Sequence, residues 1–177
     1  MRGYAACRPD ACKPSMAMAR KIDIAAAPHV KGAAYPMPYD EPCSARQRWR
    51  LGDAAGLSQF GVNLMRLPAG CWSSQRHAHA AEDEFVYVLE GEVVLVTDAG
   101  EELLKAGDCA GFKSGDGDGH HLQNRSGVEA VLLEVGSRRR GEESIDYPDI
   151  DLLFPKGAKG FQRRDGRPYG PDDYRKP

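Results

Sequence analysis

Residues 70–91 read GCWSSQRHAHAAEDEFVYVLEG and contain the most specific pattern in the chain. His77, His79 and Glu84 lie between two glycines in the spacing G-x6-H-x-H-x4-E-x6-G. Side chains at positions i and i+2 of a strand share one face, so both imidazoles can converge on one point. A tight turn before Glu84 can bring its carboxylate back to the same side. Neutral imidazoles with one carboxylate suit Fe, Mn, Ni, Co or Zn, whereas the simpler alternative is a set of polar residues on a strand surface.

Short strand-like segments, with no helical periodicity between them, surround this stretch. They cover residues 59–67, 84–89, 92–97, 101–108, 109–113, 120–124 and 128–136. Glu90 and Gly91 predict a tight hairpin between residues 84–89 and 92–97. Closely spaced short strands are typical of a closed antiparallel barrel or jelly roll, so we expect an all-β fold.

The composition fits one soluble, β-rich domain. A length of 177 residues is usual for a single domain, and 20 glycines with 12 prolines favour turns over long helices. The formal net charge of −2 lacks the basic excess that a general nucleic-acid binder needs. No segment approaches the roughly 18 apolar residues of a membrane helix. We therefore expect neither a nucleic acid nor a membrane as a partner.

The cysteines favour a reducing compartment. There are five, they are widely scattered, and none forms a C-x-x-C pair. Secreted disulfide frameworks use paired cysteines, and the N-terminal residues lack the apolar segment of a secretory signal. We expect a cytoplasmic protein whose cysteines are free thiols.

A second motif follows the first. Gly107 and Gly115 belong to a glycine-rich stretch that leads to His120 and Asn124 in the spacing H-x3-N. With the first motif, this order and spacing resemble the cupin superfamily over about residues 59–136. The resemblance implies a double-stranded β-helix, the jelly-roll barrel of that superfamily. The chain departs from the usual pattern by one residue between the first glycine and histidine, by Lys113 in place of proline, and by a longer interval before His120.

The resemblance also implies a single divalent transition metal ion held by His77, His79, Glu84 and His120, with one or two positions open to water or substrate. The choice between His120 and His121 rests on alternation and on the H-x3-N spacing. Both favour His120, because Leu122 would then share its inward face. His121 would be a residue at the rim of the barrel or a spare base.

Four further residues are candidates for binding a small-molecule substrate. Gln75 lies two residues before His77, His121 neighbours the fourth ligand, and Arg66 and Lys113 are nearby candidates for a cation that faces inward. Similarity to cupins implies a metal-dependent enzyme acting on a small oxygenated molecule, by dioxygenation, decarboxylation, or sugar or sugar-phosphate isomerisation. The alternative is a non-catalytic binding or sensing protein.

The remaining chain is predicted to form two arms around a barrel of residues 59–136. Residues 1–58 contain several prolines and predict an extended arm whose first 20 residues are disordered, and residues 137–177 predict a tail that packs on or near the barrel. If Glu84 faces inward, Phe85, Tyr87 and Leu89 face outward as an apolar patch. Soluble monomers rarely expose such patches, so we expect the N-terminal arm, a second copy of the chain, or the C-terminal segment to cover it. The resemblance to the cupins favours a homodimer.

Overall fold

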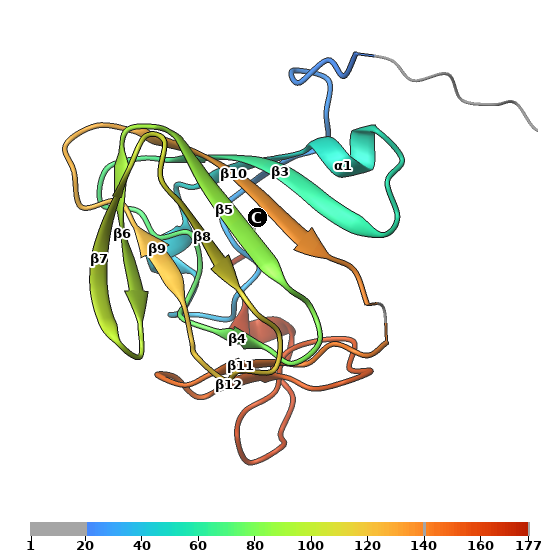
Figure 1. Cartoon of the computed structure of the whole chain (residues 1–177). Helices are drawn as coiled ribbons and strands as arrows, with labels where there is room; N and C mark the ends of the chain where they lie inside the picture. The colour runs from blue at the N-terminus through green and yellow to red at the C-terminus, as the bar shows by residue number, and fades with distance from the viewer. Residues whose placement is uncertain (1–20, 140, 177) are drawn as a thin grey trace, which may run out of the picture.

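The computed structural model describes residues 21–139 and 141–176 of the chain, most of them in short strands and loops (Figure 1). The strands are β1 (His29–Lys31), β2 (Gln47–Arg50), β3 (Phe60–Leu67), β4 (Ala78–His79), β5 (Glu84–Glu90), β6 (Glu92–Thr97), β7 (Gly100–Lys105), β8 (Cys109–Phe112), β9 (His121–Gln123), β10 (Ala130–Ser137), β11 (Ile145–Tyr147) and β12 (Leu152–Phe154). Three short helical turns accompany them: η1 (Glu41–Cys43), α1 (Leu51–Ala54) and η2 (Pro171–Asp173). Most of the predicted barrel segments therefore correspond to strands.

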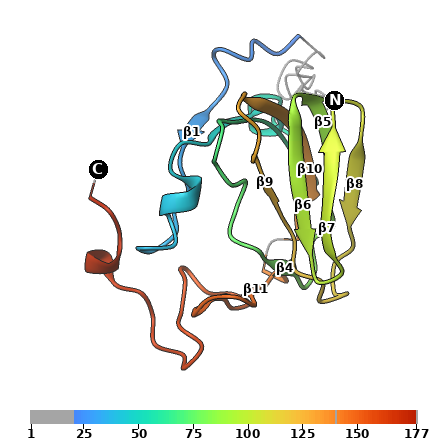
Figure 2. The same ribbon diagram turned by 90° about the vertical axis from the view of Figure 1, so that its left-hand side faces the viewer.

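Two sheets face each other and enclose the main core. One has six strands in the order β1-β2-β3-β10-β5-β8, and the other has three in the order β7-β6-β9. Figure 2 shows β6, β7 and β9 lying against β5, β8 and β10. Alternate side chains of both sheets point into the space between them and are almost fully buried. They include Met65, Leu67, Val86, Val88, Val93, Leu95, Leu104, Leu122 and Leu132. This arrangement confirms the all-β, jelly-roll fold expected from the sequence.

The alternation along β5 sets which side chains face the core. Val86 and Val88 are 3% and 0% exposed, whereas Phe85, Tyr87 and Leu89 on the opposite face are 37–42% exposed. Glu84, two residues before Val86, consequently lies on the core side of the sheet at its open end.

The predicted hairpin between residues 84–89 and 92–97 is wrong. β5 pairs with β8 and β10, whereas β6 pairs with β7 and β9, so the two strands belong to opposite sheets. Gly91 makes the corner with a φ of +75°, and a Cβ there would lie 2.9 Å from the backbone oxygen of Glu129. β5 and β6 each bury one apolar face. Because the chain passes from one sheet to the other at Gly91, both faces pack into the same core.

The segments outside the predicted barrel pack together beside it. β1 and β2 extend the six-stranded sheet, and β11 pairs with β4, which places Ile145 opposite His79. Tyr35 and Cys43 from the N-terminal side form a second buried cluster with Tyr147 and Leu152 from the C-terminal side. The expectation of disorder in residues 1–20 lies outside the described residues.

The described cysteines form no disulfide, and the described helices are short. Cys43, Cys71 and Cys109 are free thiols, the first two buried and the third exposed. Within the described part of the chain, no helix has the length and apolar character needed to cross a membrane.

Replacing Gly91 with alanine should destabilise the protein more than replacing Gly70. Both glycines have a φ near +75°, but a Cβ at Gly70 would meet no atom within 4 Å. The shared backbone cost is about 1–2 kcal/mol, and the clash at Gly91 should add about 1–3 kcal/mol. Urea unfolding of both variants measures the difference. Equal losses would show that the corner relaxes without cost.

Candidate metal centre

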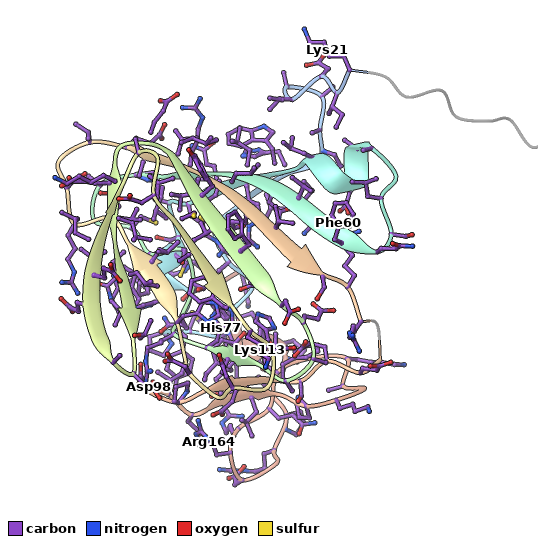
Figure 3. All side chains as sticks on the ribbon, viewed as in Figure 1. Lys21, Phe60, His77, Asp98, Lys113 and Arg164 are labelled. Carbon is purple, nitrogen blue, oxygen red and sulfur yellow. The ribbon has the colours of Figure 1, made fainter. Side chains whose placement is uncertain are left out.

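The candidate site lies at the end of the barrel where the two motifs meet. His77 and His120 form an isolated antiparallel bridge, in which each backbone N–H donates to the other residue's carbonyl oxygen, at 3.1 and 2.9 Å. His79 is in β4, next to β11, and Glu84 begins β5. Figure 3 shows His77 at the end of the barrel near the C-terminal strands. Four side chains from both motifs are thereby brought into one region.

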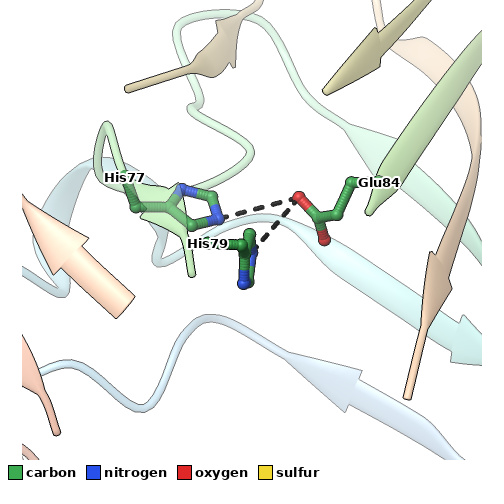
Figure 4. Close-up of side chains that lie close together, drawn as sticks. All are labelled: His77, His79 and Glu84. Atoms are coloured by element: carbon green, nitrogen blue, oxygen red, sulfur yellow. Dashed lines mark ion pairs between the residues drawn. The ribbon is translucent and has the colours of Figure 1, made fainter. Parts of the chain in front are cut away.

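These side chains converge on one carboxylate oxygen. Oε2 of Glu84 lies 3.1 Å from Nε2 of His120, 3.4 Å from Nε2 of His79 and 3.8 Å from Nε2 of His77. His77, His79 and Glu84 also satisfy the spacing of a possible metal-binding group, with their ligand atoms all within 4.8 Å of one another (Figure 4). The histidine and carboxylate donors suit a first-row transition metal ion.

The hydrogen bonds orient the histidines for such a role. Nδ1 of His77 lies 2.9 Å from the carbonyl oxygen of Gln75, so this nitrogen donates and leaves the lone pair of Nε2 toward Glu84. Both ring nitrogens of His79 are buried and make no hydrogen bond within the described residues. Unpaired buried nitrogens are costly, and coordination of an ion would satisfy Nε2. The residues present therefore fit a metal ion.

The electrostatics of His77 and Glu84 favour the protonation states that metal binding requires. Burial lowers the pKa of His77 to about 3, so its imidazole is neutral near pH 7. Burial alone would raise the pKa of Glu84, but the adjacent imidazoles of His120 and His79 outweigh it and hold that pKa well below the ordinary value. A neutral imidazole and an ionised carboxylate are the forms that bind a transition metal.

Aromatic rings hold two of the histidines in place. The ring of Phe112 stacks on His120 with centroids 3.6 Å apart, and the ring of Tyr147 stacks on His77 at 5.8 Å. The first contact comes from β8 of the barrel and the second from β11 of the C-terminal segment. Both parts of the chain consequently fix the orientation of the site.

A cavity of about 210 Å³ opens in front of these residues. Besides the histidines and Glu84, its polar lining consists of hydroxyl groups, two guanidinium groups and one carboxylate. They belong to Tyr35, Tyr147, Ser73, Ser74, Arg46, Arg48 and Glu134. Such a lining can hydrogen-bond a small, oxygen-rich molecule.

His120 and His121 occupy different positions. His120 points to Glu84, whereas Nδ1 of His121 lies 3.0 Å from the carbonyl oxygen of Ser74 and its ring packs edge-on against Trp72. His121 borders the cavity but is only 4% exposed. It is therefore a buried, hydrogen-bonded residue, which corrects the expectation of a rim position.

Three substrate-binding candidates do not reach the cavity. Gln75 is buried and donates to the carbonyl oxygen of Tyr39, because residues 73–76 are irregular and strand alternation does not apply. Arg66 alternates with inward-facing Met65 and Leu67, so it lies outside and pairs with Glu129 at 2.7 Å. Lys113 is exposed just beyond β8. The structure thus corrects all three expectations.

Residues far from the motifs line the cavity instead. Tyr35, Arg46 and Arg48 come from the N-terminal segment, and Tyr147 comes from the C-terminal segment. No motif marks them in the sequence. If residues 47–50 had been recognised as a strand, alternation with Trp49 would have predicted that Arg48 faces inward.

Comparisons with known proteins support the resemblance to the cupins. The family model described as a cupin domain matches residues 63–136. A sugar phosphate isomerase from a cupin superfamily, from Silicibacter pomeroyi, is 43% identical, with 87% of this chain and 99% of that chain covered and a TM-score of 0.79. No curated protein matches the sequence.

Two further solved structures extend the comparison. A candidate sugar phosphate isomerase from Acidithiobacillus ferrooxidans is 28% identical over 77% of this chain and 86% of that chain, with a TM-score of 0.65. A predicted oxalate decarboxylase from Thermotoga maritima is 20% identical over 68% of this chain and 100% of that chain, with a TM-score of 0.55, and shows similarity of fold alone. The barrel, the two motifs and the extent of similarity to the Silicibacter protein show that the chain belongs to the cupin superfamily.

Proposed function

We propose that the protein is a metal-dependent enzyme that holds one divalent transition metal ion through His77, His79, Glu84 and His120. The observation that supports this most directly is the convergence of three imidazole Nε2 atoms on Oε2 of Glu84. The set leaves room for further ligands, because the cavity opens beside it. An open coordination position distinguishes a catalytic site from a closed structural one.

Among the reactions considered, isomerisation of a sugar or sugar phosphate is the one we favour over dioxygenation or decarboxylation. The 43% identical Silicibacter structure is described as a sugar phosphate isomerase. The four hydroxyl groups of the cavity lining also suit a hydroxyl-rich substrate.

The ion and the surrounding residues would divide the work. A divalent cation supplies Lewis-acid polarisation of a substrate oxygen. Burial raises the pKa of the Tyr147 phenol well above its ordinary value, so this group remains protonated and can donate a hydrogen bond to the substrate. Tyr35, buried beside it, can do the same, since burial also raises its pKa.

Purified protein should contain about one transition metal ion per chain, and changing His77 or His79 to alanine should abolish that content. Elemental analysis measures the stoichiometry, and a panel of aldose and ketose phosphates tests the reaction with and without chelator. Protein that contains no metal and cannot be loaded would refute the proposal. Loaded protein that binds these compounds without turnover would instead support the binding or sensing alternative.

Changing His120 to alanine should weaken metal binding much more than the same change at His121. His120 faces Glu84 at 3.1 Å, whereas His121 is committed to the carbonyl oxygen of Ser74. Loss of one ligand of four should lower affinity by about tenfold or more. Competition with a fluorescent chelator measures both variants, and circular dichroism verifies their fold. Equal or reversed effects would place His121 in the ligand set.

We further propose that the protein is a homodimer formed through the outer face of the six-stranded sheet. Phe85, Tyr87 and Leu89 remain 37–42% exposed, so neither described terminal segment covers them. Tyr35 of the N-terminal segment and Leu152 of the C-terminal segment are buried in the second cluster instead.

The apolar surface continues across neighbouring strands. The strand register places Trp49 opposite Leu64, Leu64 opposite Leu133, and Leu133 opposite Tyr87. Four adjacent strands therefore present a row of large apolar side chains, and a second copy of the same sheet could bury it.

Changing Tyr87 to glutamate should convert the dimer to a monomer, because it would bury a charge at the centre of the interface. Light scattering coupled to size exclusion measures the mass. Leu103 of β7, 49% exposed on the other sheet, is the matched control, and its change to glutamate should leave the dimer intact. A monomeric wild-type protein would contradict the proposal.

A further inference from the structure

Arg46 is a buried cation at the cavity wall. The residue is 8% exposed, its Nε donates to the carbonyl oxygen of Gly32 at 3.0 Å, and its Nη1 donates to the carbonyl oxygen of Ser73. Among the described residues, no carboxylate forms an ion pair with it and Nη2 donates no hydrogen bond. Buried charges are normally paired, so this arrangement requires an explanation.

Arg48, the neighbouring cation, is paired. Its Nε lies 3.0 Å from Oε2 of Glu134, and its Nη2 donates to Oε1 of the same carboxylate at 3.2 Å. The two-point contact uses both oxygens of Glu134. This carboxylate is therefore committed to Arg48 and leaves Arg46 as the cation available to a ligand.

The charges of the cavity wall balance before an ion is added. Arg46 and Arg48 oppose Glu84 and Glu134. A divalent cation held by the histidines would leave two positive charges in excess. Glu143 lies behind His79, with Oε1 3.6 Å from Nδ1, and even if it is counted one positive charge remains.

The neighbours of Arg46 add neutral hydrogen-bond donors to this positive charge. The hydroxyl groups of Tyr35, Ser73 and Ser74 line the same cavity. A guanidinium group can bind two oxygens of a carboxylate or phosphate at once, and hydroxyl groups can donate to the remaining oxygens. The site is thus suited to one end of an anionic molecule whose other end faces the metal ligands.

We propose that Arg46 binds the oxyanion group, phosphate or carboxylate, of the substrate and so restricts the enzyme to anionic substrates. This inference rests on the proposed function, because the excess positive charge depends on the metal ion. Arg46 then fixes the position of the substrate relative to His77, His79, Glu84 and His120.

Calorimetric titration of the metal-loaded full chain tests the proposal, with inorganic phosphate in one arm and acetate in the other. The arm that binds more tightly identifies the anion. Arg46→Met should weaken that binding by about tenfold or more, because it removes the charged donor and keeps an unbranched side chain of similar length. Arg46→Lys should also weaken it, since an ammonium group lacks the planar two-point geometry. If the Met variant does not fold, the Lys variant decides.

Arg66→Met is the matched control, because Arg66 is an arginine on the outer surface of the six-stranded sheet. This variant should bind the anion as wild type does. Wild-type affinity in both Arg46 variants, or failure of the wild type to bind either anion, would overturn the assignment. Elemental analysis of the same samples distinguishes failure of the anion-binding role of Arg46 from failure of the proposed metal-dependent function. Loaded protein with no role for Arg46 refutes this inference alone, whereas protein without metal refutes the proposed function.

Discussion

The backbone bridge between His77 and His120 is the contact on which the candidate site depends. Two reciprocal hydrogen bonds join segments that belong to different motifs and lie on either side of β5, β6, β7 and β8 in the sequence. The bridge brings both imidazoles to the end of the barrel, where the first residue of β5 supplies Glu84. Because the core between the two sheets fixes β5 and β9, the positions of the ligands follow from the packing of the barrel.

The terminal segments contribute residues to the cavity at the end of the barrel. β11 pairs with β4 beside His79, Tyr147 stacks on His77, and Arg46 reaches the cavity from the N-terminal side. A barrel without these segments would have the same four candidate ligands in an open mouth. With them, the mouth becomes a cavity that contains hydroxyl groups and a buried cation, and the chemistry of its wall supports the choice of substrate class. Under the proposed function, the terminal segments would contribute to substrate specificity together with the motifs.

One structural constraint connects the interior of the barrel with its exterior. The direction of Glu84 requires Val86 and Val88 to face the core and Phe85, Tyr87 and Leu89 to face outward. The same alternation that builds the site therefore produces an exposed apolar face. In the proposed dimer, the second copy would cover this apolar face, which is exposed because Glu84 points inward from the same strand. β5 would then contribute to both the metal site and the dimer interface.

The sequence by itself indicated the all-β class and the positions of most strands along the chain, because spacing and two-residue alternation act within short segments. Its resemblance to the cupins pointed to the group His77, His79, Glu84 and His120. Only the tertiary structure decided that β5 and β6 lie in opposite sheets, that Arg66 and Lys113 are not part of the cavity lining, and that Gln75 binds Tyr39. It also decided that Arg46, Tyr35 and Tyr147 line the cavity. These positions depend on pairing between distant segments, which local periodicity cannot specify, since an inward or outward direction has meaning only after the sheets have packed together.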